Sequence, residues 1–405
     1  MNFVFISSEG KAIIDQHEQP IKNITLKLSR EESYIQFTVS YSFISINATL
    51  HELIQDISQI SFTDQKGYNI LIPKAVWSKP TISDKDVYII ANKQLISSVE
   101  CTLKCEFIDF CIEKGKHCNS DYEMKFFISK HNFTQDFTIN LNSTDISFNY
   151  RESCFIFPKT KVYSDKKHTK CEEYKKIFNA IQHIYALYYG HFFRKTHTEF
   201  KGSDYHKIYG NINEDFELYA SVEGYYFCNY KDITFIDFLK EVFPRVYEEQ
   251  KDERDKNRGW RLNLLIHYYL LFTRTNNLQI QFLLLSVFME SLKYSYGKYI
   301  AQLKERRAGE FLKENRTWVE GLIYNQKNVY SFEEMIQLVY KKLDIQDGYI
   351  QFITKRNDVV HSGTIEKITR DKIFPLENQV REILKNIIEF KGTLYYRDSR
   401  GGEYR

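Results

Sequence analysis

The sequence predicts an α+β protein of several domains, in which a β-rich region comes first and an α-helical region comes last. Up to about residue 165 hydrophobic residues alternate with polar ones, whereas beyond residue 251 they recur at helical spacing. The 405 residues, at about 100–200 per domain, suggest two or three domains. We therefore divide the chain into a β-rich domain (1–165), a mixed α/β connecting region (166–250) and an all-α domain (251–405).

The first region consists of short segments that are rich in β-branched and aromatic residues. Clusters of Asn, Asp, Ser and Gly separate these segments, as in strands joined by turns. The pattern is typical of an antiparallel sandwich or barrel-like domain. The predicted strands are 21–28, 34–39, 87–91, 98–110, 123–128 and 137–141.

The connecting region combines helical and strand-like patterns. Residues 171–189 carry apolar side chains at a spacing of roughly 3.6 and predict an amphipathic helix. A strand-like patch follows at 216–227. Residues 233–247 predict a second helix, which Pro244 should end or kink, because proline lacks a backbone donor.

The last region begins after a charge-rich, solvated connector at 251–261. Apolar periodicity beyond it predicts a run of helices and therefore an all-α bundle. The predicted helices are 260–273, 278–296, 299–312, 331–343, 349–361 and 375–390.

Composition and charge narrow the range of functions. A hydrophobic content of 43%, with only 16 Gly and 6 Pro, excludes a disordered or fibrous chain. A net charge of +3 is not the strongly basic footprint of a protein that coats nucleic acid, although it allows a local basic surface. We find no P-loop, GxGxxG, HExxH or GxSxG pattern, which disfavours an NTPase, a dehydrogenase, a zincin protease or an esterase.

We expect neither a signal peptide nor a membrane-spanning stretch, and therefore a cytoplasmic protein without a membrane partner. The N-terminus has no basic segment before its short apolar stretch, so we expect no signal peptide. The most apolar run, 282–289, is far shorter than the ~20 residues needed to span a bilayer. Seven cysteines at irregular spacing indicate a reducing compartment.

Five potential metal ligands lie close together in the sequence: Cys101, Cys105, Cys111, His117 and Cys118. Their spacing does not match the paired C-x2-C knuckles of structural zinc sites. Strand alternation instead explains the first two as small buried hydrophobic residues. We therefore predict no metal and no cofactor, with a zinc site as the less favoured alternative.

The segment that bears chemistry is GYIQFITKRNDVVHSG, near the C-terminus. On a helix, Asn357 and His361 are four residues apart and share a face, whereas Arg356 lies about 140° around the axis from His361. One straight helix therefore does not easily aim the arginine and the histidine at one point. Either the long Arg356 side chain bends across, or a second helix supplies the missing neighbour. Two such helices that meet about a two-fold axis would bring arginine and histidine together, which suits a site completed by two copies of the chain.

Arginine and histidine together suit metal-independent RNA cleavage. Histidine titrates near neutrality and can act as the base for the 2′-OH or as the acid for the leaving oxygen. Arginine presents a permanently charged planar fork to a phosphate. Because the attacking group is the 2′-OH of the substrate, DNA would not be cut. The alternative is a helix end with a solvated Arg356 and a His361 favoured by the helix dipole.

The segment RNDVVH resembles the R-N-x-x-x-H form of the Arg-x4–6-His motif of HEPN domains. The wider C-terminal region is similar to the ApeA-like HEPN branch, which is associated with bacterial anti-phage defence. Two further features carry this resemblance: the helix FLLLSVFMESLKYSYG, which contains Glu290, and a closing helix at 380–390 followed by GTLYYRDSRGG.

The resemblance implies an all-α HEPN bundle that dimerises through the motif face. It also implies a metal-independent endoribonuclease, often directed at tRNA or other translation RNAs. Arg356 and His361 would be the catalytic pair, Asn357 the polar residue that orients the site, and Glu290 an acidic residue of the same site. Glu290 could equally pair with a buried basic residue, because a carboxylate in so apolar a helix rarely lacks a partner.

A basic stretch interleaved with aromatic residues is the candidate RNA-binding surface. Such residues can hold a strand by phosphate contacts and by stacking, although a run of charges is more often a solvated helix face. Its members are Lys298, Lys304, Arg306, Arg307 and Tyr296.

The sequence thus favours a homodimeric endoribonuclease of an anti-phage, abortive-infection system, whose N-terminal domain senses a phage-encoded trigger or restrains the nuclease. The alternative is a non-catalytic protein. There the C-terminal domain would serve as a dimerisation or nucleotide-binding module, and the N-terminal domain would bind a protein or glycan ligand.

Overall fold

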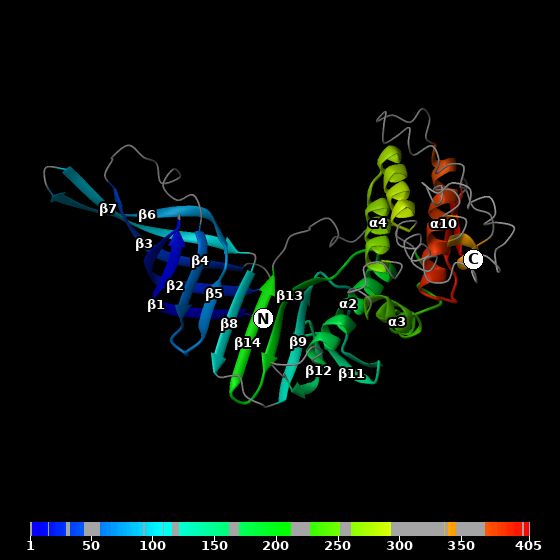
Figure 1. Cartoon of the computed structure of the whole chain (residues 1–405), viewed down its shortest axis with the longest axis horizontal. Coiled ribbons are helices and arrows are strands. Elements are labelled where there is room, and N and C mark those ends of the chain that lie inside the picture. Colours follow the sequence, from blue (N-terminus) through cyan, green and yellow to red (C-terminus); the bar gives the residue numbers. More distant parts are fainter. Residues whose placement is uncertain are drawn as a thin grey trace, which may run out of the picture. The chain divides into compact units, whose positions relative to one another are not determined.

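The computed structural model divides the chain into two compact units (Figure 1). The sheet unit comprises Met1–Glu173 and Arg194–Asp215, and the helix-rich unit comprises Tyr174–Phe193 and Phe216–Arg405. The structure describes residues 2–14, 16–29, 33–43, 57–91, 94–107, 109–115, 121–161, 170–211, 227–251, 261–292, 336, 339–345, 369–398 and 401–404.

The sheet unit is built on one antiparallel sheet, with fourteen strands among its described residues. The strand order is β1-β2-β3-β7-β6-β4-β5-β8-β14-β13-β9-β12-β11-β10. The strands are β1 (Asn2–Ile14), β2 (His17–Ser29), β3 (Ser33–Phe43), β4 (Ile57–Thr63), β5 (Asn69–Ile72), β6 (Ala75–Ala91), β7 (Gln94–Phe107), β8 (Asp109–Gly115), β9 (Asp121–Ser129), β10 (Phe137–Leu141), β11 (Thr144–Asn149), β12 (Cys154–Lys161), β13 (Arg194–Lys201) and β14 (Tyr205–Asn211).

The first part of this sheet closes on itself. Because β1 pairs with β4 as well as with β2, the pairings β1-β2-β3-β7-β6-β4 return to β1. This ring surrounds an apolar core to which Phe37, Ile60 and Leu103 contribute, each 0% exposed. Alternation along the strands thus places one side of each strand in the core and the other side outside it.

A bulge in β2 adjusts the alternation to this core. The register of β2 on β3 shifts between Lys22 and Thr25, and Asn23 has a φ of 50°. As a result both Ile21 and Ile24 are fully buried although they are three residues apart. Without the extra residue, one part of the strand would turn its apolar side chains outward.

The far end of the sheet is a hairpin of β10 and β11 that packs aromatic side chains. Its two-residue turn, Asn142–Ser143, has φ values of 50° and 58°, as tight hairpins require. Phe137 and Phe148 face each other across the hairpin and stack with ring centroids 5.2 Å apart. These contacts fix the register of the hairpin.

The helix-rich unit contains the helical segments α3 (Phe235–Lys251), α4 (Leu262–Arg274), residues 278–292 and 339–342, and α10 (Arg370–Ile387). It also takes most of α2 (Lys170–Tyr189), from Tyr174 onward. The C-terminal strands β15 (Tyr395–Asp398) and β16 (Gly401–Tyr404) pair as a hairpin.

Aromatic side chains from distant segments form the core of this unit. Phe238 of α3 lies against Phe390, with ring centroids 5.0 Å apart, and Phe227 lies against Tyr269 of α4 at 6.1 Å. Gly190, with a φ of 77°, ends α2, and its carbonyl accepts a hydrogen bond of 3.0 Å from Arg274 Nη2. The end of α2 is thereby tied to α4.

The fold class predicted from the sequence is wrong in its second half. A large antiparallel sheet dominates the chain, and no all-α HEPN bundle is found among the described residues. The helix-rich unit includes the hairpin β15–β16 and a bridge between Cys228 and Leu394. The strands in this tail are only four residues long, too short for their alternation to stand out against a helical background. A β-rich N-terminal region is consistent with the sheet unit.

Several individual helices lie where the sequence predicts them. The helices predicted at 171–189 and 260–273 correspond to α2 and α4, and residues 278–292 are helical as expected. The sequence predicts that Pro244 ends or kinks its helix. It lies within α3, which continues to Lys251, so it does not end the helix. Buried side chains on both sides of the proline, such as Phe243 and Val246, hold the helix in place.

None of the helices described in the structure is both long and apolar enough to cross a membrane.

Candidate functional site

Most of the residues predicted to form the site lie outside the described residues. This holds for the motif residues Arg356, Asn357 and His361. It also holds for the predicted RNA-binding residues Lys298, Lys304, Arg306, Arg307 and Tyr296. Their arrangement therefore remains the prediction made from the sequence.

Glu290 is the one predicted site residue that the structure describes. It lies on the helical segment 278–292 and is half-buried, at the margin of the face that carries Phe282, Leu285 and Met289, each 0% exposed. Ile280 and Leu283 on the same segment are exposed, at 47% and 37%. Glu290 thus borders the buried face of an amphipathic helix that also carries an exposed apolar patch.

The stretch before the motif is anchored to the helix that follows it. Before the motif, Val339 and Tyr340 are buried, and the carbonyl of Leu343 accepts a hydrogen bond of 2.9 Å from Asn386 Nδ2 of α10. After the motif, α10 itself begins at Arg370. The described stretch before the motif therefore contacts the helix that begins after it.

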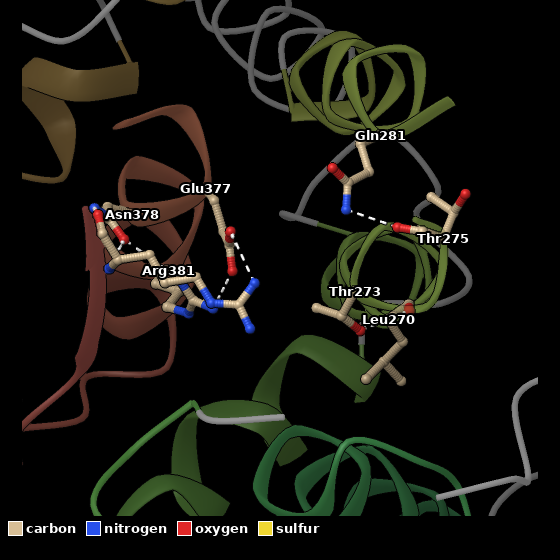
Figure 2. Close-up of polar contacts among 8 residues, drawn as sticks. Leu270, Thr273, Thr275, Gln281, Glu377, Asn378 and Arg381 are labelled. Atoms are coloured by element: carbon tan, nitrogen blue, oxygen red, sulfur yellow. Dashed lines mark hydrogen bonds and ion pairs between the residues drawn. The ribbon is translucent and has the colours of Figure 1, made fainter. Parts of the chain in front are cut away.

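α10 carries a buried pair of opposite charges, shown in Figure 2. Arg381 Nη2 bonds the Glu377 carboxylate one turn earlier, and the two side chains are 1% and 2% exposed. The rings of Tyr269 and Tyr395 lie 5.9 Å and 5.8 Å from the guanidinium carbon. The arginine is therefore held by its carboxylate and by two aromatic faces, an arrangement that fixes structure rather than leaving a charge for a substrate.

The C-terminal hairpin is fastened to α10 next to this pair. Asn378 Nδ2 donates to the carbonyl of Arg397 at 2.7 Å, and the Arg397 amide donates to Asn378 Oδ1 at 2.9 Å. The side-chain amide of Asn378 thus bonds the backbone of β15 through one donor and one acceptor, as the backbone of a neighbouring strand would. Tyr396 Oη also donates to the Glu382 carboxylate.

The cysteine cluster is only partly described. Cys105 is buried at 0% exposure, as alternation predicts, and burial raises the pKa of its thiol to about 12. Within the described part of the chain, no group of three or more His, Cys, Asp and Glu could hold a metal ion. His117 and Cys118 lie outside that part.

The sheet unit contains a polar cluster that the sequence did not reveal. Tyr68 Oη lies 3.0 Å from His206 Nδ1, and His206 Nε2 lies 2.6 Å from Glu199 Oε1. Tyr68 comes from the turn between β4 and β5, His206 from β14 and Glu199 from β13. Because 138 positions separate Tyr68 from His206, no local motif could have predicted this contact.

Comparison of the chain with models of protein families, with curated proteins and with solved structures finds no match.

Proposed function

We propose that the chain is a metal-independent endoribonuclease of a bacterial abortive-infection system, and that two copies complete its site. The observation that carries the proposal is the segment Arg356-Asn357-x-x-x-His361, with its resemblance to the Arg-x4–6-His motif of HEPN domains. The proposal concerns the chemistry of this segment and does not depend on an all-α bundle.

The proposed reaction is attack of the 2′-OH on the adjacent phosphodiester. His361 of one copy removes the 2′-OH proton and, once protonated, gives a proton to the leaving 5′-oxygen. Arg356 stabilises the negative charge that develops on the phosphate, and Asn357 orients the pair. The products are a 2′,3′-cyclic phosphate and a 5′-hydroxyl, and no metal takes part.

Three features of the described residues support this proposal. The stretch before the motif is hydrogen-bonded to the helix that follows it, because Asn386 of α10 donates to the carbonyl of Leu343. Glu290 is half-buried on a segment, 278–292, that is helical, as the resemblance implies. The exposed Ile280 and Leu283 on that helix offer apolar surface to a second copy.

The proposal extends to the partners of the enzyme. Its substrate would be RNA, such as tRNA, bound through the basic stretch between Lys298 and Arg307. The sheet unit would sense a phage-encoded trigger protein or restrain the nuclease. We place the protein in the bacterial cytoplasm, where its seven cysteines stay reduced.

The experiment is an RNA-integrity assay with the purified chain and with cells that express it under phage infection. Wild type should break RNA in the presence and in the absence of EDTA, and should leave DNA of the same sequence intact. Arg356→Ala and His361→Ala should each abolish cleavage. Lys372→Ala, an exposed residue on α10, is the matched control and should cut like wild type.

The results of this assay distinguish a metal-independent ribonuclease from the alternatives. Cleavage that EDTA stops, or that survives His361→Ala, would contradict the proposal. Intact RNA in every sample from infected cells, with the chain still dimeric, would instead support a non-catalytic dimerisation or nucleotide-binding module.

A further inference from the structure

The cluster of Tyr68, His206 and Glu199 in the sheet unit has the order of a nucleophile, a base and an orienting carboxylate. The strand pairing places His206 opposite Lys114 of β8, and Glu199 opposite Lys125 of β9. Two hydrogen bonds, of 3.0 Å and 2.6 Å, join the three side chains in a chain. A nucleophile within reach of a base that a third group orients is the recurring geometry of covalent catalysis.

The charge of the Glu199 carboxylate sets the direction of both hydrogen bonds made by His206. Burial raises the pKa of Glu199, but the hydrogen bond from His206 and the charge of Lys125 act against burial, and the net pKa is lowered. The ionised carboxylate can only accept, and His206 Nε2 must carry the hydrogen. In the neutral imidazole, Nδ1 therefore holds a lone pair and accepts the Tyr68 hydroxyl. The phenol proton thus points at a base.

Tyr68 keeps its proton until that base takes it. Burial, followed by the charges of Asp64 and Glu199, raises the pKa of Tyr68, so the phenol is neutral at rest. Serine nucleophiles in hydrolases work in the same way, because their proton leaves only as the new bond forms. Tyr68 is half-buried and the His206 side chain is 19% exposed, so neither residue is fully enclosed.

A lysine supplies the charge that an anionic substrate needs. Lys114 Nζ lies 5.2 Å from the centroid of the Tyr68 ring. An ammonium at this position can accompany a phosphate that approaches the phenol oxygen, since lysine binds phosphate as a compact point charge. Phe5, whose ring meets Tyr68 at 5.5 Å with an interplanar angle of 73°, holds the tyrosine in place.

We propose that Tyr68, His206 and Glu199 form a second reactive site, in which Tyr68 is a nucleophile toward phosphodiesters. In the step, Tyr68 Oη forms a bond to phosphorus while the bond from phosphorus to the leaving oxygen breaks. The phenol proton moves to His206 Nδ1, and Glu199 stabilises the resulting imidazolium. The product is a tyrosyl phosphodiester, and no oxidant or metal is consumed. This site uses no residue of the ribonuclease motif.

The test uses bis(4-nitrophenyl) phosphate and the full-length chain. Wild type should release a burst of 4-nitrophenolate and carry a 4-nitrophenyl phosphate adduct on the peptide that contains Tyr68, identified by mass spectrometry. Tyr68→Phe should abolish both, and His206→Gln should slow adduct formation by about 100-fold or more. Tyr34→Phe is the matched control, because Tyr34 also has a lysine over its ring, Lys27 at 5.7 Å.

A second readout keeps the proposal falsifiable if His206→Gln fails to fold. In wild type, the rate of adduct formation should not depend on ionisation of the phenol, because His206 takes the proton as the new bond forms. Absence of an adduct on Tyr68 in the folded chain would overturn the proposal. A rate that rises only with ionisation of the phenol would also overturn it. Because Arg356→Ala and His361→Ala should leave the adduct unchanged, failure here is distinguishable from failure of the ribonuclease proposal.

Discussion

Arg381 and Glu377 form an ion pair across one turn of α10, with both side chains almost completely enclosed, at 1% and 2% exposure. Because both side chains are enclosed, each charge stabilises the other, and a lone buried charge would cost several kcal/mol. The tyrosines over the guanidinium come from α4 and β15, so the pair joins three elements of the helix-rich unit.

Breaking this pair should destabilise the helix-rich unit more than removing it. Arg381→Ala and Glu377→Gln should each lower the free energy of unfolding by about 3–5 kcal/mol. Arg381→Ala leaves Glu377 with only the longer contact to Arg397 Nη1, at 3.7 Å, and Glu377→Gln leaves the Arg381 charge without a carboxylate. Glu377→Leu combined with Arg381→Met should cost less than either single change. Urea unfolding followed by far-UV circular dichroism measures the effect, with Lys372→Ala as an exposed control within about 0.5 kcal/mol of wild type. A double variant that is less stable than both single variants would contradict this prediction.

The C-terminal hairpin should loosen when the Asn378 amide is removed. Asn378→Ala deletes both hydrogen bonds to the Arg397 backbone, at 2.7 Å and 2.9 Å. We expect hydrogen exchange at the Arg397 amide to accelerate by about tenfold, equivalent to one hydrogen bond of about 1.4 kcal/mol. Asn378→Asp, which keeps only the acceptor, should protect the Arg397 amide better than alanine does. Equal exchange in all three proteins would show that the hairpin does not depend on Asn378.

The stability of the sheet unit should fall in mild acid because of His197. Burial lowers the pKa of His197 from 6.5 to about 4. The folded state therefore stays neutral while the unfolded chain takes up a proton, so stability is full above about pH 6.5 and falls until about pH 4. The loss over this range should be roughly 3 kcal/mol.

His197→Asn tests this assignment. The Thr196 hydroxyl donates to the carbonyl of Phe127 at 3.2 Å, so it must accept from His197 Nδ1, 3.0 Å away. An asparagine amide can replace that donor without titrating, and the variant should lose less stability than wild type between pH 7 and pH 4.5 in urea titrations. His17→Asn, at an exposed position of β2, should behave as wild type does. An unchanged acid sensitivity in His197→Asn would mean that another group controls it.

The cysteines of the sheet unit should differ in reactivity. Cys105 is fully buried and burial raises its pKa to about 12, whereas Cys111 is half-buried. Under native conditions, iodoacetamide should label Cys111 much faster than Cys105, as measured by peptide mapping. Treatment with EDTA should not speed labelling of Cys105. If EDTA does speed it, a metal held by this region would be indicated instead.

Local periodicity predicted the elements that bury one face. The helices α2 and α4 and the strands β2, β9 and β10 repeat apolar residues at the spacing of their own structure, so a short window of sequence suffices. The segment of β13, RKTHTEFK, has no apolar alternation. One of its faces carries His197 and Glu199, and tertiary pairing with β9 holds it in the sheet. No local rule predicts such a strand.

Sites that depend on distant contacts could not be predicted from local patterns. The pair Glu377–Arg381 has the i,i+4 spacing of an ordinary surface ion pair, and only packing against α4 and β15 makes it buried. The contact of Tyr68 with His206 arises from the strand order of the sheet. The proposed ribonuclease motif is the reverse case, because its residues lie within six positions of the sequence and its arrangement stays a prediction.

The most direct test of the central claim is complementation between two inactive variants. If Arg356 of one copy acts with His361 of the other, Arg356→Ala and His361→Ala should each leave RNA intact alone. Unfolded together and refolded as a mixture, they should regain a measurable part of wild-type cleavage, because mixed dimers hold one arginine and one histidine across the interface. A mixture as inactive as its two components, from variants that still exchange subunits, would contradict a site shared between two copies.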